Sequence, residues 1–411
     1  GLVGSEMCIR DRMKSVYCYM LAGLMLSASS CSSWLSEDDA PVMSYDYYET
    51  EAGVNAAITA AYGFLRWGVG GERFDVLTEL GTDLFTEGED GSNRESYNKY
   101  ATQLNPDDGI LYEMWENHYK GISDANIAMQ KIRDSQDLLE SVKIQSYAEM
   151  QFIRAYLYFD LVQQFGRIPL VTEGSFEIRT DFKRAPIADV YNVIISDLRN
   201  AAENLPEKAS VLGRATRYSA AHLLAKVYLT RGSAVKDARG QKATDMDSTL
   251  YYAEQVINSG AYALQENFSS LWDIKNQGNS EAVFAVQFTT EPMFNGDGNK
   301  QHLYWLSWYE DQPGMLRDIE NGRPYRRHVA TKKTMDDLFD RLHDSRFYKS
   351  FKWVYYANNV STLPVWESLS YDGNVYFTPD PSKGQIEGEL KFQHGDTAIY
   401  YTMQELSLIH I

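Results

Sequence analysis

The sequence predicts a mostly α-helical protein with a loop-rich, partly β C-terminal portion. Across residues 47–260, apolar side chains recur every three or four positions, which is the spacing of helices that bury one face. After residue 289, glycine, asparagine, aspartate and proline interrupt short aromatic runs, a composition typical of loops and short strands. We therefore expect a helical body that carries an irregular second part.

The most informative helix is expected over residues 144–165. Its apolar stripe is so broad that other helices must cover it. Gly166 and Pro169 should end it, because glycine accepts a left-handed turn and proline lacks a backbone donor. Thr216 is the expected N-cap of a later helix, and Gly232 its stop. The remaining stripes predict helices within residues 54–65, 115–132, 187–205, 218–229 and 248–257.

Small residues at the stripe centres favour close helix crossings. Ala125, Ala155, Ala221 and Ala225 occupy such positions, as small residues do in tetratricopeptide helix pairs. No clean repeat with a period of about 34 residues is present, so the residues alone give weak support for a repeat protein.

The C-terminal portion contains three short elements. Apolar residues alternate over 282–288 and predict a strand, and the run FKWVYY at 351–356 predicts another. A four-residue apolar spacing within 334–342 predicts one helix.

The N-terminal region is typical of an exported lipoprotein. Residues 13–30 begin with a charged start, continue through an apolar run too short to span a bilayer, and end in small residues before Cys31. All 3 cysteines lie within the first 31 residues, so the processed protein would keep only Cys31, the expected lipidation site. An ordinary signal peptide with a chance cysteine is the alternative.

Charge narrows the range of partners. The chain carries 39 basic and 57 acidic residues, a net charge of −18, which disfavours nucleic acid and an anionic membrane surface as direct partners. Neutral ligands such as sugars remain compatible. The 29 tyrosines suit binding faces that stay partly wet, because the ring is apolar and the hydroxyl polar.

No catalytic or cofactor motif is present in the sequence. The histidines form no H-E-x-x-H pair, no glycine-rich phosphate loop follows a strand, and no G-x-S-x-G elbow occurs. We expect no enzyme activity, no cofactor and no metal. A carboxylate cluster at Glu79, Asp83, Glu87 and Glu89 is interpreted as an exposed, self-repelling loop. A glycosidase pair and a calcium site are its alternatives, although the spacing matches no EF-hand.

Two aromatic segments are the candidate binding regions. A planar ring can cover the apolar face of a sugar while neighbouring polar groups bond its hydroxyls. The alternative for the tryptophans is packing against the helical body. The candidates for glycan contact are Asn93, Arg94, Tyr97 and Tyr100 in the first segment, and Tyr304, Trp305, Trp308, Tyr309 and Arg317 in the second.

Four long segments, in order along the chain, resemble the SusD/RagB family of outer-membrane nutrient-uptake lipoproteins. They are LYEMWENHYKGISDANIAMQKI at 111–132, AEMQFIRAYLYFDLVQQFGRIPL at 148–170, YNVIISDLRNAAENLP with GRATRYSAAHLLAKVYLTRG at 191–206 and 213–232, and AEQVINSGAYALQENFSSLWDIKNQGNSEAVFAVQF at 253–288. The resemblance implies a tetratricopeptide-like scaffold of helical hairpins. It also implies an aromatic arc for glycan, contributed by loops in the two candidate regions, with positions that vary among members.

The resemblance also divides the chain. We expect a non-native leader at residues 1–12, a lipoprotein signal peptide at 13–30, a SusD-like N-terminal helical region at 31–260, an incomplete SusD/RagB C-terminal region at 261–403, and a non-native tail at 404–411. On this interpretation the chain is truncated at its C-terminus.

The implied function is capture of oligosaccharide or polysaccharide at the cell surface. The protein would be lipid-anchored in the outer membrane, face outward, and pass its cargo to a SusC-like TonB-dependent barrel, with no nucleic acid involved. Two alternatives remain open at this point: a secreted glycoside hydrolase, and a helical-repeat scaffold lipoprotein that binds no sugar.

Overall fold

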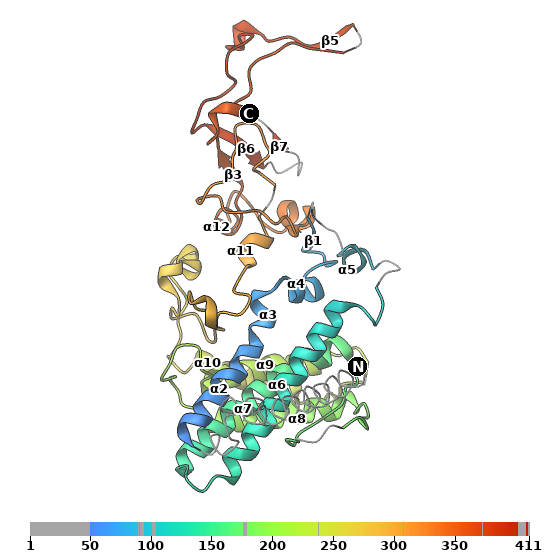
Figure 1. Cartoon of the computed structure of the whole chain (residues 1–411), viewed down its shortest axis with the longest axis vertical. Coiled ribbons are helices and arrows are strands. Elements are labelled where there is room, and N and C mark those ends of the chain that lie inside the picture. Colours follow the sequence, from blue (N-terminus) through green and yellow to red (C-terminus); the bar gives the residue numbers. More distant parts are fainter. Residues whose placement is uncertain are drawn as a thin grey trace, which may run out of the picture.

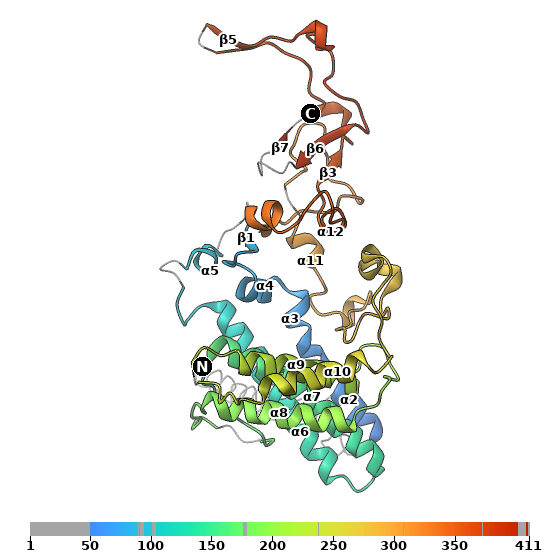
Figure 2. The same cartoon turned by 180° about the vertical axis from the view of Figure 1, so that it is seen from behind.

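A computed structural model describes residues 50–88, 90, 94–100, 104–175, 179–236, 238–306, 308–371, 373–401 and 408–409. The expected leader, signal peptide, Cys31 and Asn93 lie outside these residues, as does most of the expected tail. The molecule is elongated, with long helices at one end, short elements in the middle, and a small sheet with a protruding hairpin at the other end (Figures 1 and 2).

Long helices build the first end of the molecule. Each of them from α6 to α10 packs against the next one along the chain, and α2 lies against both α6 and α7. This succession of helix hairpins confirms the predicted mostly α, tetratricopeptide-like scaffold. The long helices are α2 (Glu51–Leu65), α6 (Gly109–Asp134), α7 (Glu140–Phe165), α8 (Ile187–Asn204), α9 (Arg217–Gly232) and α10 (Asp245–Ile257).

Helix α7 is the centre of the main core. Its middle is buried on all sides, with Ile153, Ala155 and Tyr158 fully covered, because α2, α6 and α8 surround it. The helix ends as predicted at Gly166, whose φ of 68° favours a residue without Cβ. Thr216 is confirmed as the N-cap of α9, where its hydroxyl accepts from the Ser219 backbone in a capping box.

The middle of the molecule consists of short elements from two distant parts of the sequence. Strand β1 pairs antiparallel with β2, and Phe85 lies opposite Ala330. A small core formed by Val76, Leu80, Tyr97 and Ile110 joins this region to the start of α6. The elements are α3 (Trp67–Gly70), α4 (Glu72–Thr78), β1 (Phe85–Glu87), α5 (Glu95–Lys99), α11 (Gln301–Tyr304), β2 (His328–Ala330) and a π-helical turn (Lys333–Asp337).

The far end is loop-rich and partly β, as predicted. Strands β3, β6 and β7 form an antiparallel sheet over a small second core, and β4 and β5 form a hairpin that projects away from it. The elements are β3 (Val354–Tyr356), β4 (Leu369–Tyr371), β5 (Asn374–Phe377), β6 (Thr397–Tyr401), β7 (Leu408–Ile409), α12 (Arg346–Ser350), and 3-10 turns η2 (Phe268–Trp272), η3 (Ile274–Asn276), η4 (Pro292–Phe294), η6 (Val360–Thr362) and η7 (Pro381–Lys383).

Three local predictions need correction. The segment 282–288, expected as a strand, joins no ladder in the described part of the chain, and its Phe284 packs on Phe152 of α7 with ring centroids 5.2 Å apart. The helix expected at 334–342 is only the π-helical turn Lys333–Asp337. In the cluster expected as a repelling loop, Glu87 lies in strand β1 and meets Lys99 at 3.4 Å, whereas Glu89 lies outside the described residues.

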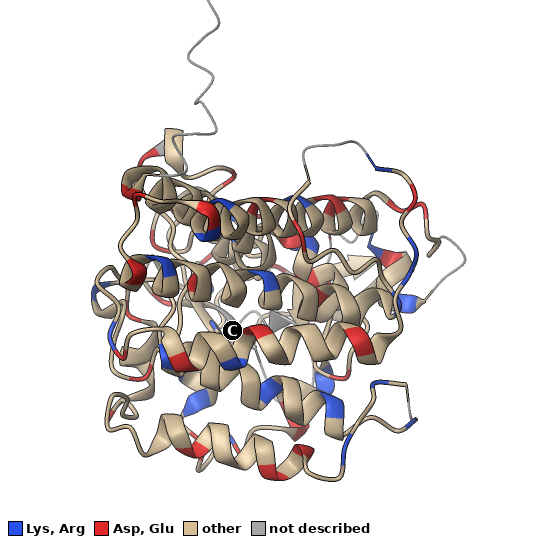
Figure 3. Cartoon of the chain, turned by 90° about the horizontal axis from the view of Figure 1, so that it is seen from below, with Lys and Arg blue, Asp and Glu red and all other residues tan. Residues whose placement is uncertain are grey.

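Two further features concern membrane spanning and the distribution of charge. Among the described residues, no helix has the length and apolar character needed to cross a membrane. Seen from below, acidic and basic residues are interspersed over the helices rather than gathered by sign (Figure 3).

Candidate functional site

The structure brings together the two aromatic regions that the sequence separates by more than two hundred positions. The β1–β2 ladder joins them, and beyond it the Gly88 amide donates to the Arg327 carbonyl at 2.8 Å. The Trp305 ring of the second region also contacts Phe85 of β1 edge-on, with ring centroids 4.8 Å apart. We call residues 82–100 and 301–331, as far as they are described, the rim.

Trp308 is the most exposed tryptophan of the rim. Its ring is 36% exposed, and the Arg326 guanidinium lies 4.8 Å from the ring centroid and covers one face. The indole nitrogen donates to Asp311 at 2.6 Å, which holds the ring in one orientation. The result is a planar apolar surface bordered by a cation and a carboxylate.

Trp305, three positions before Trp308, is half-buried. Its indole nitrogen donates to the Gln301 side chain at 2.9 Å, and its ring lies 5.0 Å from the buried ring of His328. Neighbours therefore fix this ring more fully than that of Trp308, and it presents less surface to solvent.

Tyr100 is the open ring of the first region. It is 69% exposed and follows α5 in a left-handed conformation with φ of 52°. Its hydroxyl donates to the Gly81 carbonyl at 3.2 Å, so the ring is tethered at its tip. Tyr97, one turn earlier, is only 7% exposed, and its hydroxyl donates to Asp108. The ring belongs to the small core at the start of α6, and ligand contact by Tyr97 stays an untested prediction.

Tyr304 and Tyr309 are also buried, and their predicted contact with glycan stays untested. Tyr309 has no exposed surface and stacks on Tyr355 at 4.9 Å, so neither ring face is open to a sugar. Tyr304 is 8% exposed and packs against Tyr325. Both rings anchor the rim to the interior instead of presenting it to ligand.

The two predicted arginines differ in position. Arg94 is 8% exposed and forms an ion pair with Glu72 of α4, and its prediction as a glycan contact stays untested. Arg317 lies at the surface and makes a two-pronged contact with Glu310, at 2.5 and 2.7 Å. The Arg317 hydrogen bond holds the pKa of Glu310 below its usual range. Of the predicted residues, Tyr100, Trp305, Trp308 and Arg317 remain as candidates at the surface.

A buried polar cluster between the rim and α4 was not predicted. His328 has no exposed surface, and burial lowers its pKa to about 4. Asp75 of α4 lies 3.7 Å from the His328 ring nitrogen, and burial raises the pKa of this carboxyl to about 6. Arg327 adds a 2.9 Å contact with Asp90. These groups tie the rim to α4, and their scattered positions give no sequence motif.

Arg326 was missed as well, although a signal was present. It lies in the run RPYRRHV at 323–329, a cluster of cations next to a predicted aromatic segment. Such a run is a reason to expect cation–π contacts. Among the described residues, no group of three histidine, cysteine or acidic side chains is placed to hold a metal ion.

The fold is therefore a scaffold of helix hairpins that carries a rim with exposed aromatic rings. A family model described as "Starch-binding associating with outer membrane" (SusD-like) matches residues 43–229. Together with the relatives below, this match shows that the chain is similar to SusD-like proteins.

Curated relatives and a solved structure have the same family name. The chain is 27% identical to SusD-like protein P2 of Formosa agariphila over 341 residues, which cover 76% of this chain and 63% of that protein. It is 27% identical to the starch-binding protein SusD of Bacteroides thetaiotaomicron over 176 residues, 43% of this chain and 29% of that protein. The structure of a laminarin-binding SusD-like protein matches with a TM-score of 0.60 and 25% identity, covering 74% of this chain and 66% of that one.

The chain thus spans slightly less than two thirds of the length of the first relative and of the laminarin-binding structure. The matched family region ends within α9, so the rim residues after position 300 lie beyond it.

Proposed function

We propose that this protein binds glycan at its rim without cleaving it. The observation that carries the proposal is the β1–β2 ladder, which unites two distant aromatic segments and leaves Trp308 and Tyr100 exposed beside polar groups. A ring covers the apolar face of a sugar, while Arg326, Asp311 and Arg317 can donate to and accept from its hydroxyls. The names of two relatives support a sugar as ligand, since they refer to laminarin and starch.

The expected affinity is modest. Few rings are open, and a flexible oligosaccharide loses conformational freedom on binding. A dissociation constant in the micromolar to millimolar range corresponds to roughly 4–8 kcal/mol. Such weak binding suits a protein that must release its cargo.

The cellular role that we propose is delivery of oligosaccharide to a SusC-like TonB-dependent barrel. The protein would be lipid-anchored through Cys31 at the outer membrane and would face outward. The family description, which refers to association with the outer membrane, supports the location. Detergent extraction of the native lipoprotein from outer membranes tests the partnership: we expect a barrel to co-purify, and recovery of the lipoprotein alone would contradict it.

Affinity electrophoresis tests sugar binding. Gels containing laminarin or starch should retard the purified chain, and Trp308→Ala should lower the association constant about tenfold, or about 1.4 kcal/mol. Trp272→Ala is the matched control, because Trp272 is 72% exposed on η2, on the opposite side of the molecule from α5. Equal mobility of the Trp308→Ala variant and the native chain would reject the rim as the site. Release of reducing ends during incubation would indicate a hydrolase.

A further inference from the structure

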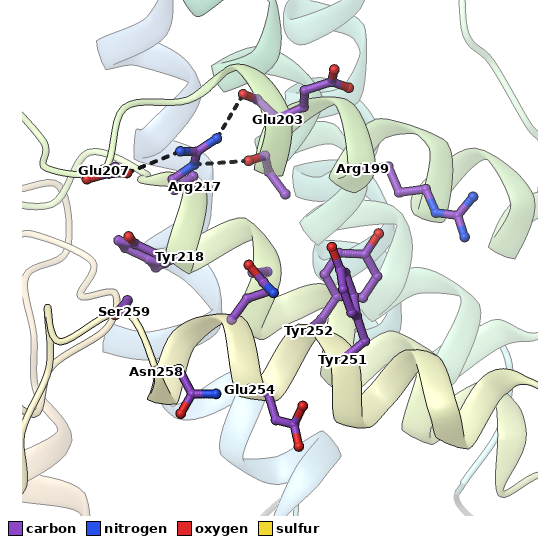
Figure 4. A pocket seen from close by; sticks show the side chains of 13 residues that line it. Arg199, Glu203, Glu207, Arg217, Tyr218, Tyr251, Tyr252, Glu254, Asn258 and Ser259 are labelled. Carbon is purple, nitrogen blue, oxygen red and sulfur yellow. Dashed lines mark hydrogen bonds and ion pairs between the residues drawn. The ribbon is translucent and has the colours of Figure 1, made fainter.

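A hollow in the helical body lies apart from the rim. It has a volume of about 710 Å³, is open to solvent, and is lined by residues from α8, α9, α10 and the turn after α10 (Figure 4). Helix α9 packs on both neighbours and forms the floor, while α8 and α10 form the walls. We call this the α8–α10 groove and define it by Arg199, Glu203, Tyr218, Tyr251, Tyr252 and Asn258. Its size is within the range of small-molecule sites, roughly 300–1,000 Å³.

Two tyrosine rings rise from α10 toward α8. Tyr252 stacks on the buried Tyr228 of α9, with centroids 5.9 Å apart and planes at 6°, so its position is fixed by the core. Tyr251 meets Tyr252 edge-on at 5.0 Å and is 55% exposed. The groove therefore offers an exposed ring supported by a rigid one, which lowers the entropy lost on binding.

Polar groups surround these rings on both walls. Arg199 and Glu203 extend from α8, Glu254 from α10 and Asn258 from its C-cap, so donors and acceptors both line the groove. Arg217 is already engaged, with Glu207 at 3.3 Å and with the Glu203 carbonyl at 3.3 Å, and it closes one end.

The charges in the groove nearly balance. The lining residues include two arginines and three glutamates, which disfavours a phosphorylated or strongly anionic ligand. Helical walls offer no open strand edge for pairing with an extended peptide. A neutral ligand with many hydroxyls and an apolar ring face matches an exposed tyrosine among mixed donors and acceptors.

We propose that the α8–α10 groove is a second glycan-binding site, which takes a neutral oligosaccharide segment against Tyr251. This inference rests on the proposed function, since it assumes the same class of ligand. With a site on the helical body and another at the rim, one polysaccharide chain could be held at two points. Binding at the second point then becomes intramolecular, and affinity for long chains exceeds that for short ones.

Binding of laminarin to a set of variants tests the proposal. In a Trp305→Ala/Trp308→Ala background, residual binding should fall at least fivefold on Tyr251→Ala and should be kept by Tyr251→Phe, which retains the ring. Tyr376→Ala is the matched control, because this tyrosine is 69% exposed on the β4–β5 hairpin at the far end of the molecule. Thermal unfolding followed by circular dichroism checks that each variant is folded.

The outcomes separate the two proposals. Unchanged binding by Tyr251→Ala in both the native and the rim-variant backgrounds would overturn the groove site. If the rim variant binds like the native chain while Tyr251→Ala abolishes binding, the groove is supported as a glycan site and the rim is rejected as one. A native chain that binds no glycan would overturn both.

Discussion

His328 illustrates how a buried titratable group couples the rim to pH. Burial lowers its pKa from 6.5 to about 4, with Glu72, Arg94, Arg327 and Asp75 as its charged neighbours. Its neutral form fits the folded state, so its contribution to stability is complete above pH 6.5 and is lost as the pH falls toward 4. Asp75 acts in the opposite direction: its pKa is raised to about 6, so its protonation between pH 6 and 4 favours the folded state.

Comparing the native chain with His328→Leu isolates the contribution of the histidine to the pH dependence of stability, because Asp75 is present in both proteins. Between pH 7 and pH 4, the stability of the native chain relative to the variant should fall by about 3 kcal/mol. Urea unfolding at each pH measures this difference. A difference that stays constant with pH, also in an Asp75→Asn background, would contradict a neutral buried His328.

A second buried group lies in the helical core. Arg154 of α7 donates twice to Asp197 of α8, at 2.8 Å in both contacts, and Gln151 donates to the same carboxylate. Asp197→Asn would leave the arginine charge buried without its partner, and we expect a loss of about 3–5 kcal/mol in the free energy of unfolding.

Urea denaturation of Asp197→Asn checks this loss. The control is Asp181→Asn, because Asp181 pairs with Arg179 at the surface, where water screens the contact. The control should unfold like the native chain. A native-like midpoint for Asp197→Asn would show that the buried pair contributes little.

At the level of single residues, the sequence predicted the kinds of side chain at the rim but not their burial. Trp308 and Tyr100 are exposed as expected, whereas Tyr309 and Tyr97 are covered. All four are aromatic residues in polar, loop-like segments, so composition cannot distinguish them. Their burial depends on partners such as Tyr355 and Asp108, and only the tertiary fold brings these close.

At the scale of elements, the helices were predictable because their apolar stripes repeat over many turns. Ala125 and Ala155 are fully buried at helix crossings, as their place in the stripes suggested. The strand at 282–288 was mispredicted because alternating apolar residues indicate a partly covered segment but do not indicate that another strand pairs with it. Here Phe284 packs on Phe152 of α7 and lies near Tyr62 of α2, and no strand among the described residues pairs with the segment.

The crossing of α6 with its neighbours gives a prediction for a whole element. A Cβ on Gly121 would lie 2.6 Å from Leu157 of α7 and 3.0 Å from Phe64 of α2. Gly121→Val should therefore push the helices apart and cost about 1–3 kcal/mol. Gly63→Val is the control, since nothing lies within 4 Å of that position. Chemical unfolding compares the two, and equal midpoints would contradict close packing at Gly121.

At the scale of the whole molecule, two cores of different size support the two ends. The large core lies among the long helices, and the small one, with Tyr309 and Tyr355, lies under the β3–β6–β7 sheet. The rim lies between them and is tied to α4 by the buried cluster around His328 (Figure 1). Regular spacing revealed the first core in the sequence. The second core forms through contacts among irregular segments, whose apolar residues show no regular spacing in the sequence.

Hydroxyl-radical footprinting with and without laminarin tests the central claim most directly, because it reports which rings a bound glycan covers. We predict that laminarin protects Trp308 and Tyr100 from oxidation, measured by mass spectrometry, while Trp272 is oxidised equally in both samples. Laminarin that binds the protein yet leaves Trp308 and Tyr100 as reactive as before would contradict glycan binding at the rim.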